Sequence, residues 1–305
     1  MVMMACSQAP QPAATASPAA CRLPISLPLK QGGLQDAFLS FPTGKVTIDP
    51  SGNGGIYYDR PFKRWLPFPV DRHAVSSDGA SYAYMDHKVP GTPQQSRLHV
   101  VDLSTGKDQS YDLGSPGDVS AYVVVDFAAG GIWLSYAGYE SLPGGLLFLD
   151  LATGSLKDTG IPGITAPVAS GQGVIWFTDP GPNPQQSGYG IGFTLQARVL
   201  RLTTADSRIE TWFTKAGVNV SFVGADLAWH PVISTYANQG NVYEMWLAKS
   251  PTEAKLIGLP PGDYNLIADS HGLWFGSQQG IYLYSDAGKL QKVSDQPGYP
   301  GNGCF

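Results

Sequence analysis

The sequence is poor in charge, has no basic patch, and has no apolar run long enough to cross a membrane as a helix. Charged residues make up 14% of the 305 residues, against about a quarter in an average protein. The longest basic cluster is Lys63-Arg64, so the clustered Lys and Arg that nucleic-acid binding requires are missing. We therefore expect no nucleic-acid partner and no membrane-spanning helix.

The motifs of common catalytic and cofactor sites are also missing. None of the five histidines stands in a His-x-x-x-His or His-Glu-x-x-His pattern, which zinc sites on helices use. The sequence has no Gly-x-Ser-x-Gly elbow and no phosphate-binding loop. The glycines of residues 188–192 lie in a proline-rich segment with no helix after them. We expect no cofactor and no metal, and the pattern favours a non-catalytic protein.

Glycine and proline are abundant, whereas stretches that favour helices are scarce. The chain has 37 glycines and 25 prolines, about a fifth of all residues, and 11% of its residues are aromatic. Such a composition is typical of many short strands joined by tight turns. The length suits one large β-rich domain.

A strand motif recurs along the chain, in which Gly or Asp precedes apolar residues and a tryptophan. Its copies contain Trp133, Trp176, Trp229 and Trp274, which are 43, 53 and 45 residues apart. Hairpin-like turns follow several copies, as in Asp102 to Gly106 and Asp150 to Gly154. In such turns Asp bonds to the backbone two residues on, and Gly adopts the left-handed conformation without steric cost.

These signals predict a single all-β propeller with six four-stranded blades. A four-stranded sheet with two partly apolar faces is buried when such sheets pack radially. The units run roughly over residues 33–73, 74–114, 118–160, 163–213, 217–258 and 265–294. Residues 21–30 and 295–305 could add strands, so seven blades is the main alternative. A two-sheet sandwich is disfavoured because the repeat is regular.

One segment carries a family resemblance. Residues 74–84, with Ser76-Ser77-Asp78-Gly79 at their centre, resemble the inner-strand motif of TolB-type and WD40-like bacterial propellers. Ser77 stands where that family usually has proline. The Gly-apolar-Trp strands are similar to those of streptogramin-lyase-type propellers. The resemblance implies a propeller but leaves the function open, because propellers serve many roles.

The N-terminal segment predicts a tether and an export signal. Cys6 follows a short apolar run and Ala5, which is typical of the end of a lipoprotein signal, and residues 7–20 contain only Ser, Gln, Pro, Ala and Thr. Such a segment buries too little apolar surface to fold. We expect residues 1–20 to form a leader and tether and Cys6 to be lipidated, the alternative being an ordinary leader with an incidental cysteine.

The other two cysteines bracket the domain predicted over residues 21–305. Cys21 begins this domain, and Cys304 is the penultimate residue. In a closed ring the first and last strands are neighbours, so we predict a disulfide between them; the alternative is two unrelated thiols. A disulfide indicates an oxidising compartment. We therefore expect an extracytoplasmic protein, either secreted or at the cell surface, that contacts the membrane only through a lipid anchor.

Long insertions gather between the second and third strands of the predicted blades, at residues 88–96, 137–144, 179–195 and 231–241. Loops carry function more often than strands do, although neutral insertions would look the same. Aromatic and amide side chains suit a protein or carbohydrate partner. The candidates for this ligand-binding face are Tyr139, Glu140, Tyr189, Phe193, Tyr236 and Asn238.

A catalytic alternative places acids and histidines on an upper rim. By alignment of the units, Asp86, His87, Asp179 and His230 lie at similar strand ends. Such a rim would suit a metal-assisted lyase or a glycan-active enzyme, but the histidine-glutamate-histidine motif of streptogramin lyases is missing. The sequence favours a monomeric binding or scaffold module for protein or glycan. An envelope sensor or assembly module similar to TolB-like propellers is a third interpretation.

Overall fold

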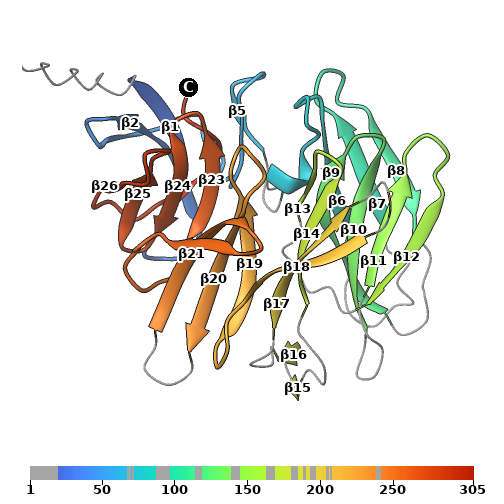
Figure 1. Cartoon of the computed structure of the whole chain (residues 1–305). Helices are drawn as coiled ribbons and strands as arrows, with labels where there is room; N and C mark the ends of the chain where they lie inside the picture. Colours follow the sequence, from blue (N-terminus) through green and yellow to red (C-terminus); the bar gives the residue numbers. More distant parts are fainter. Residues whose placement is uncertain are drawn as a thin grey trace, which may run out of the picture.

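The computed structural model is a six-bladed β-propeller (Figure 1). It describes residues 20–66, 70, 72–86, 97–113, 119–138, 145–162, 169–179, 185–187, 190–192, 197–203, 206, 208–237 and 242–305. In this part of the chain no helix is long and apolar enough to cross a membrane.

Blades 3 to 6 each contain four antiparallel strands that follow one another along the chain. Blade 3 consists of β9 (Val119–Ala128), β10 (Gly131–Gly138), β11 (Gly145–Asp150) and β12 (Leu156–Pro162). Blade 4 consists of β13 (Ala169–Gly171), β14 (Val174–Asp179), β17 (Arg198–Thr203) and β18 (Arg208–Thr214), with the hairpin β15 (Gln185–Ser187) and β16 (Gly190–Gly192) inserted between its second and third strands. Blade 5 consists of β19 (Asn219–Ala225), β20 (Pro231–Ala237), β21 (Val242–Ser250) and β22 (Glu253–Leu256). Blade 6 consists of β23 (Asn265–Asp269), β24 (Gly272–Ser277), β25 (Gly280–Tyr284) and β26 (Leu290–Ser294).

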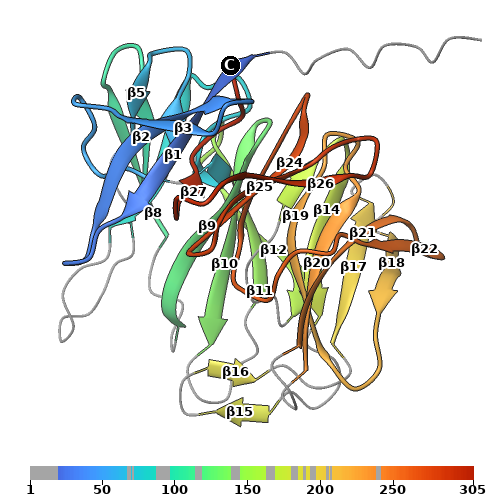
Figure 2. The ribbon, with the colours of Figure 1, turned by 90° about the vertical axis from the view of Figure 1, so that its left-hand side faces the viewer.

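Blade 1 takes strands from both ends of the chain. Its order is β27 (Tyr299–Pro300), β1 (Cys21–Pro28), β2 (Leu34–Phe41) and β3 (Lys45–Ile48). β1 pairs with β27 near the C-terminus (Figure 2). Residues 21–30 and 295–305, the segments that could have formed a seventh blade, therefore belong to the first blade. The predicted bounds of the first unit, residues 33–73, are wrong. Pairing between strands so far apart in sequence leaves no local signal.

Blade 2 is the least regular of the six. It contains β6 (Ser81–Asp86), β7 (Arg97–Asp102) and β8 (Asp108–Asp112), and Val75 forms an isolated bridge to Tyr82 where the other blades have an innermost strand. The segment that leads into blade 2 forms the small hairpin β4 (Tyr58–Asp59) and β5 (Arg64–Trp65) and the 3-10 helix η1 (Arg72–Ala74).

Apolar clusters lie between neighbouring blades, as radial packing requires. Leu23 and Ile25 of blade 1 pack with Trp274 of blade 6, and Val125 of blade 3 clusters with Ile175 of blade 4. Burial of each such side chain stabilises the fold by about 1.5–3 kcal/mol. No blade can bury both of its faces alone, so the ring has to close.

Three of the four repeated tryptophans occupy matching positions, and one does not. Trp133, Trp176 and Trp274 are the third residues of β10, β14 and β24. Trp229 instead lies in the turn before β20, with a φ of 61°, and Ile233 takes the strand position. The assignment of Trp229 to a strand is wrong. The residues before Trp229 resemble those before the other three tryptophans, but β20 begins only at Pro231, two residues after Trp229.

The predicted hairpin turns are confirmed in detail. Asp102 accepts backbone hydrogen bonds from Ser104 and Thr105, both at 2.8 Å, and Gly106 has a φ of 70°. These turns and those between first and second strands define one face of the ring, the turn face, at the top of Figure 1. The opposite face, here called the loop face, carries the connections between second and third strands and between blades.

Candidate functional site

A pocket of about 510 Å³ opens at the propeller axis on the turn face. Ala128, Gly171 and Ala225 are the last residues of the innermost strands β9, β13 and β19, and all three line it. Small residues at these positions leave the axial space open. Buried Val75 and Phe127 add apolar surface to the lining. The lining also contains His73, Ser77, Asp126, Gln172 and Asp226. The pocket, here called the axial pocket, is therefore suited to an apolar group with polar atoms beside it.

The turn between β19 and β20 forms one wall of the axial pocket and is held firmly. Asp226 accepts hydrogen bonds from the backbone N–H groups of Ala228 (2.9 Å) and His230 (2.8 Å), and its second oxygen lies 2.9 Å from His230 Nδ1. The Trp229 carbonyl accepts a hydrogen bond from the Trp176 indole at 3.1 Å. Leu227, at the tip of the turn, is 61% exposed. The turn thus presents an apolar side chain to solvent from a rigid support.

The same turn connects the axial pocket to a groove between blades 5 and 6. This groove has a volume of about 410 Å³ and shares Asp226 and Leu227 with the axial pocket. Lys249, Lys255 and His230 also line it. With its Nδ1 beside Asp226, the His230 ring is oriented by a carboxylate, an arrangement that fixes a histidine for hydrogen bonding through its other nitrogen.

A third cavity, of about 440 Å³, lies on the loop face near the start of β23 and is here called the loop-face pocket. Its lining contains carboxylate, amide and phenol groups. Gln278 donates a hydrogen bond to the Tyr299 hydroxyl at 2.8 Å. The residues that line it are Gly262, Asp263, Tyr264, Asn265, Ser277, Gln278, Gln279 and Tyr299. Polar groups beside aromatic rings are the usual surroundings of a sugar ring.

Two tyrosines connect this pocket to the ligand-binding face expected from the sequence. Tyr236 lies near the end of β20, with its ring 5.6 Å from that of Tyr243. Burial and a hydrogen bond to Asp263 raise the pKa of Tyr243 to about 12. The other candidates for that face, Tyr139, Glu140, Tyr189, Phe193 and Asn238, lie outside the described residues, as do His87 and Cys6.

The rim expected from the sequence does not assemble from its described members. Asp86 and Asp179 end β6 and β14 on the loop face, and Asp179 forms an ion pair with Arg198 at 2.7 Å. His230 precedes β20 and lies on the turn face. Because the sequence pattern placed Trp229 inside a strand, it also placed His230 at the wrong end of that strand, on the loop face. Within the described ranges, no group of three or more His, Cys, Asp or Glu residues is arranged to hold a metal ion.

The residues that line the axial pocket and the loop-face pocket are not among the candidates expected from the sequence, except for neighbours of Tyr236 and His230. The small residues at the ends of innermost strands are a weak signal, because alanine and glycine are common throughout the chain. Leu227, an apolar residue directly after the turn-forming Asp226, was the one local signal available. In the loop-face pocket β23 meets β27, the C-terminal strand that pairs with β1, and local pattern does not reveal such a contact.

Solved structures with similar folds support the architecture. No protein-family model and no curated protein matches the sequence. The structure of TolB from Acinetobacter baumannii has a TM-score of 0.55 and 12% identity, and the alignment covers 93% of this chain and 67% of that one. An oligogalacturonate lyase in complex with manganese has a TM-score of 0.52 and 12% identity, with 87% and 72% coverage. At this identity the likeness shows the propeller fold alone.

Proposed function

We propose that the protein is a binding module that docks a protein partner at the axial pocket of the turn face. The supporting observation is the turn that holds Leu227 in solvent beside an apolar cavity. Apolar side chains exposed around a cavity are typical of protein interaction sites. The fold is shared with a TolB and with a lyase, so the geometry of the site, not the fold, is the basis for this choice.

The proposal includes an extracytoplasmic location. A disulfide joins Cys21 and Cys304, and such bonds persist in oxidising compartments. Lipidation of Cys6 and a tether over residues 7–20 would hold the domain, as a monomer, at a membrane surface. The mass of the intact, non-reduced protein purified from its cell envelope tests the anchor, because a lipidated Cys6 would add the mass of its acyl chains.

A displayed peptide library selected on the purified protein tests the docking site. We expect enriched peptides to share an apolar residue and to bind at least tenfold more weakly to the Leu227→Asp variant. Leu256, on the outer strand β22 of the same blade, is 45% exposed. Leu256→Asp is therefore the matched control and should bind as the parent does. Equal losses in both variants, or none in either, would reject the axial pocket as the docking site.

The loop-face pocket supports a second candidate function, the binding of a glycan. Asp263, Asn265 and Gln278 are exposed and face a cavity walled by Tyr264 and Tyr299. Amides and carboxylates hydrogen-bond to sugar hydroxyls, and aromatic rings cover the apolar face of the sugar.

Binding to a glycan array, followed by calorimetric titration of any hit, tests this second function. We expect Asn265→Ala and Gln278→Ala each to weaken binding several-fold, whereas Gln291→Ala on the outer strand β26 leaves it unchanged. Retention of full affinity by both pocket variants would contradict the assignment. Leu227→Asp should not affect glycan binding, so the two candidate functions can be separated.

A further inference from the structure

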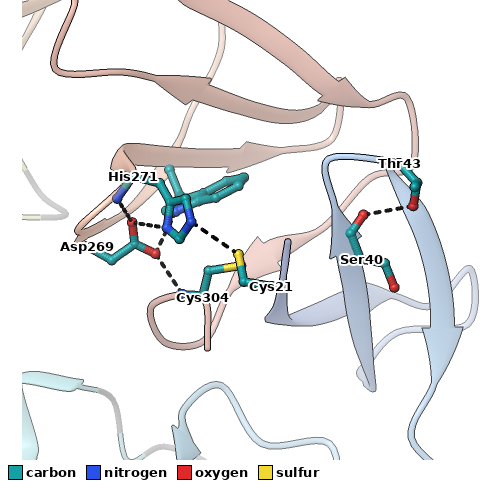
Figure 3. Close-up of a disulfide and its surroundings, with 7 residues drawn as sticks. Cys21, Ser40, Thr43, Asp269, His271 and Cys304 are labelled. Carbon is teal, nitrogen blue, oxygen red and sulfur yellow. Dashed lines mark hydrogen bonds and ion pairs between the residues drawn. A yellow bond between two sulfur atoms is a disulfide. The ribbon is translucent and has the colours of Figure 1, made fainter. Parts of the chain in front are cut away.

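The disulfide lies against a histidine and an aspartate that the two proposed binding sites do not use. His271 Nε2 is 3.6 Å from Cys21 Sγ, and Asp269 Oδ1 is 3.3 Å from His271 Nδ1 (Figure 3). The second Asp269 oxygen accepts hydrogen bonds from the backbone N–H of Cys304 (2.7 Å) and from the indole of Trp274 (2.8 Å). The same carboxylate accepts a hydrogen bond from the backbone N–H of His271 (2.7 Å), so it holds the backbone of both the histidine and the partner cysteine and lies beside the imidazole.

The surroundings fix the imidazole and expose the two sulfurs unequally. The His271 ring makes an edge contact with Phe41 at 5.6 Å, and Asp269 is almost completely buried. Cys304 is 7% exposed, whereas Cys21 is half-buried. A thiolate from outside therefore reaches Cys21 more easily than Cys304. A cysteine beside a protonated histidine is a more acidic thiol, and hence a better leaving group, than an isolated cysteine.

We propose that the Cys21–Cys304 bridge is a thiol–disulfide exchange site for a dithiol reductant, with His271 stabilising the Cys21 thiolate. In the first step a thiolate of the reductant attacks Cys21 Sγ. A bond forms between these sulfurs, the Cys21–Cys304 bond breaks, and Cys304 leaves and takes a proton. In the second step the other thiolate of the reductant attacks its own first sulfur, so that Cys21 is expelled as a thiolate beside protonated His271. The dithiol thus loses two electrons and two protons, of which Cys304 and His271 take one proton each.

Exchange at this bridge would act on the seam, which is the pairing of the C-terminal segment with β1 that closes the ring. Besides the bridge, the C-terminal segment is held to β1 by reciprocal backbone hydrogen bonds between Arg22 and Phe305 (2.8 and 3.1 Å) and by one from Gly301 to Pro24 (2.9 Å). The Phe305 ring also stacks on Tyr58 at 5.6 Å. The pairing of β27 with β1 and the hydrogen bonds from Asn302 to Tyr57 (3.1 Å) and Tyr58 (2.8 Å) also remain without the bridge. Reduction therefore removes the covalent link of the seam and leaves its non-covalent contacts in place.

The test measures the redox equilibrium and the reactivity of each thiol in the full chain. Every protein carries Cys6→Ser, so that only the bridge cysteines react. Each is equilibrated with dithiothreitol and its oxidised form, alkylated, and quantified by mass. Each pKa unit by which the Cys21 thiol lies below pH 7 favours the reduced form about 10-fold. We therefore expect the His271→Asn variant, which lacks this effect, to have a reduced-to-oxidised ratio at pH 7 that is lower than that of the parent by this factor. His99→Asn, which removes a histidine paired with Asp108 at 2.9 Å far from the bridge, should leave the ratio unchanged.

A second measurement needs no change at residue 271. In the reduced Cys6→Ser protein, the rate of alkylation by iodoacetamide is followed against pH and assigned to each cysteine by peptide mass. We expect Cys21 to react with a midpoint below pH 7, and Cys304 with a midpoint at or above the ordinary value of about 8.5. An ordinary midpoint for Cys21, or an unchanged redox ratio in a folded His271→Asn variant, would overturn the proposal.

Discussion

Replacement of both bridge cysteines by serine should lower the thermal stability of the propeller by a predictable amount. The bridge joins residues separated by 283 positions, so it excludes a very large number of conformations from the unfolded chain. The chain-entropy model assigns about 5.6 kcal/mol to a loop of this length. With an unfolding entropy of about 2 cal/mol/K per residue, this corresponds to a fall in Tm of about 9 °C.

Scanning calorimetry of Cys6→Ser and of Cys6→Ser with Cys21→Ser and Cys304→Ser measures this difference directly. The shared Cys6→Ser change prevents a stray thiol from forming a new bridge. The two serines also keep the volume at the seam nearly constant, so the main change is in the unfolded state. A fall in Tm of less than about 3 °C would refute the reasoning, because it would mean that the bridge does not restrict the unfolded chain as the chain-entropy model assumes.

Three further predictions concern the blades and their turns. A Cβ at Gly171 would clash with the Trp229 ring, so Gly171→Ala should displace that indole, cost roughly 1–3 kcal/mol and shift the tryptophan fluorescence; an unchanged spectrum would contradict it. Hydrogen bonding from Ser104 lowers the pKa of Asp102 from 3.8 to about 2, so its contribution to stability is complete above pH 3.8 and lost as the pH falls through 2. An NMR titration should show this pKa, and Ser104→Ala should raise it. Trp274→Phe removes a buried indole hydrogen bond of 2.8 Å and should cost roughly 1.5–3 kcal/mol in urea denaturation; a cost below 0.5 kcal/mol would contradict it.

The sequence predicted the blades correctly wherever all residues that define a turn lie within a single hairpin. The turns at Asp102 and Asp150 follow from side-chain hydrogen bonds to residues two and three positions away, so four or five residues contain all the information. The same locality explains the error at Trp229. Asp226-Leu227-Ala228-Trp229 matches the strand motif by composition, but Asp226 bonds to the next backbone groups and holds these residues in a turn.

The candidate sites were less predictable because residues distant in sequence form them. His73, Gly171 and Leu227 meet at the axial pocket only because separate innermost strands end around one axis. Tyr299 reaches the loop-face pocket only because β27 joins β1 at the seam. For Tyr236 the sequence predicted exposure in a binding loop, whereas the structure places it in a strand against Tyr243.

The sequence by itself determined the all-β composition, the repeat of hairpins and the two cysteines at the limits of the domain, because each depends on residue type and short spacing. Only the tertiary structure decided how the ring closes, which face each strand end reaches, and that His271 and Asp269 stand beside the bridge. These features depend on the pairing of β1 with β27 and on the direction of each strand around the axis, which are set by packing between distant segments.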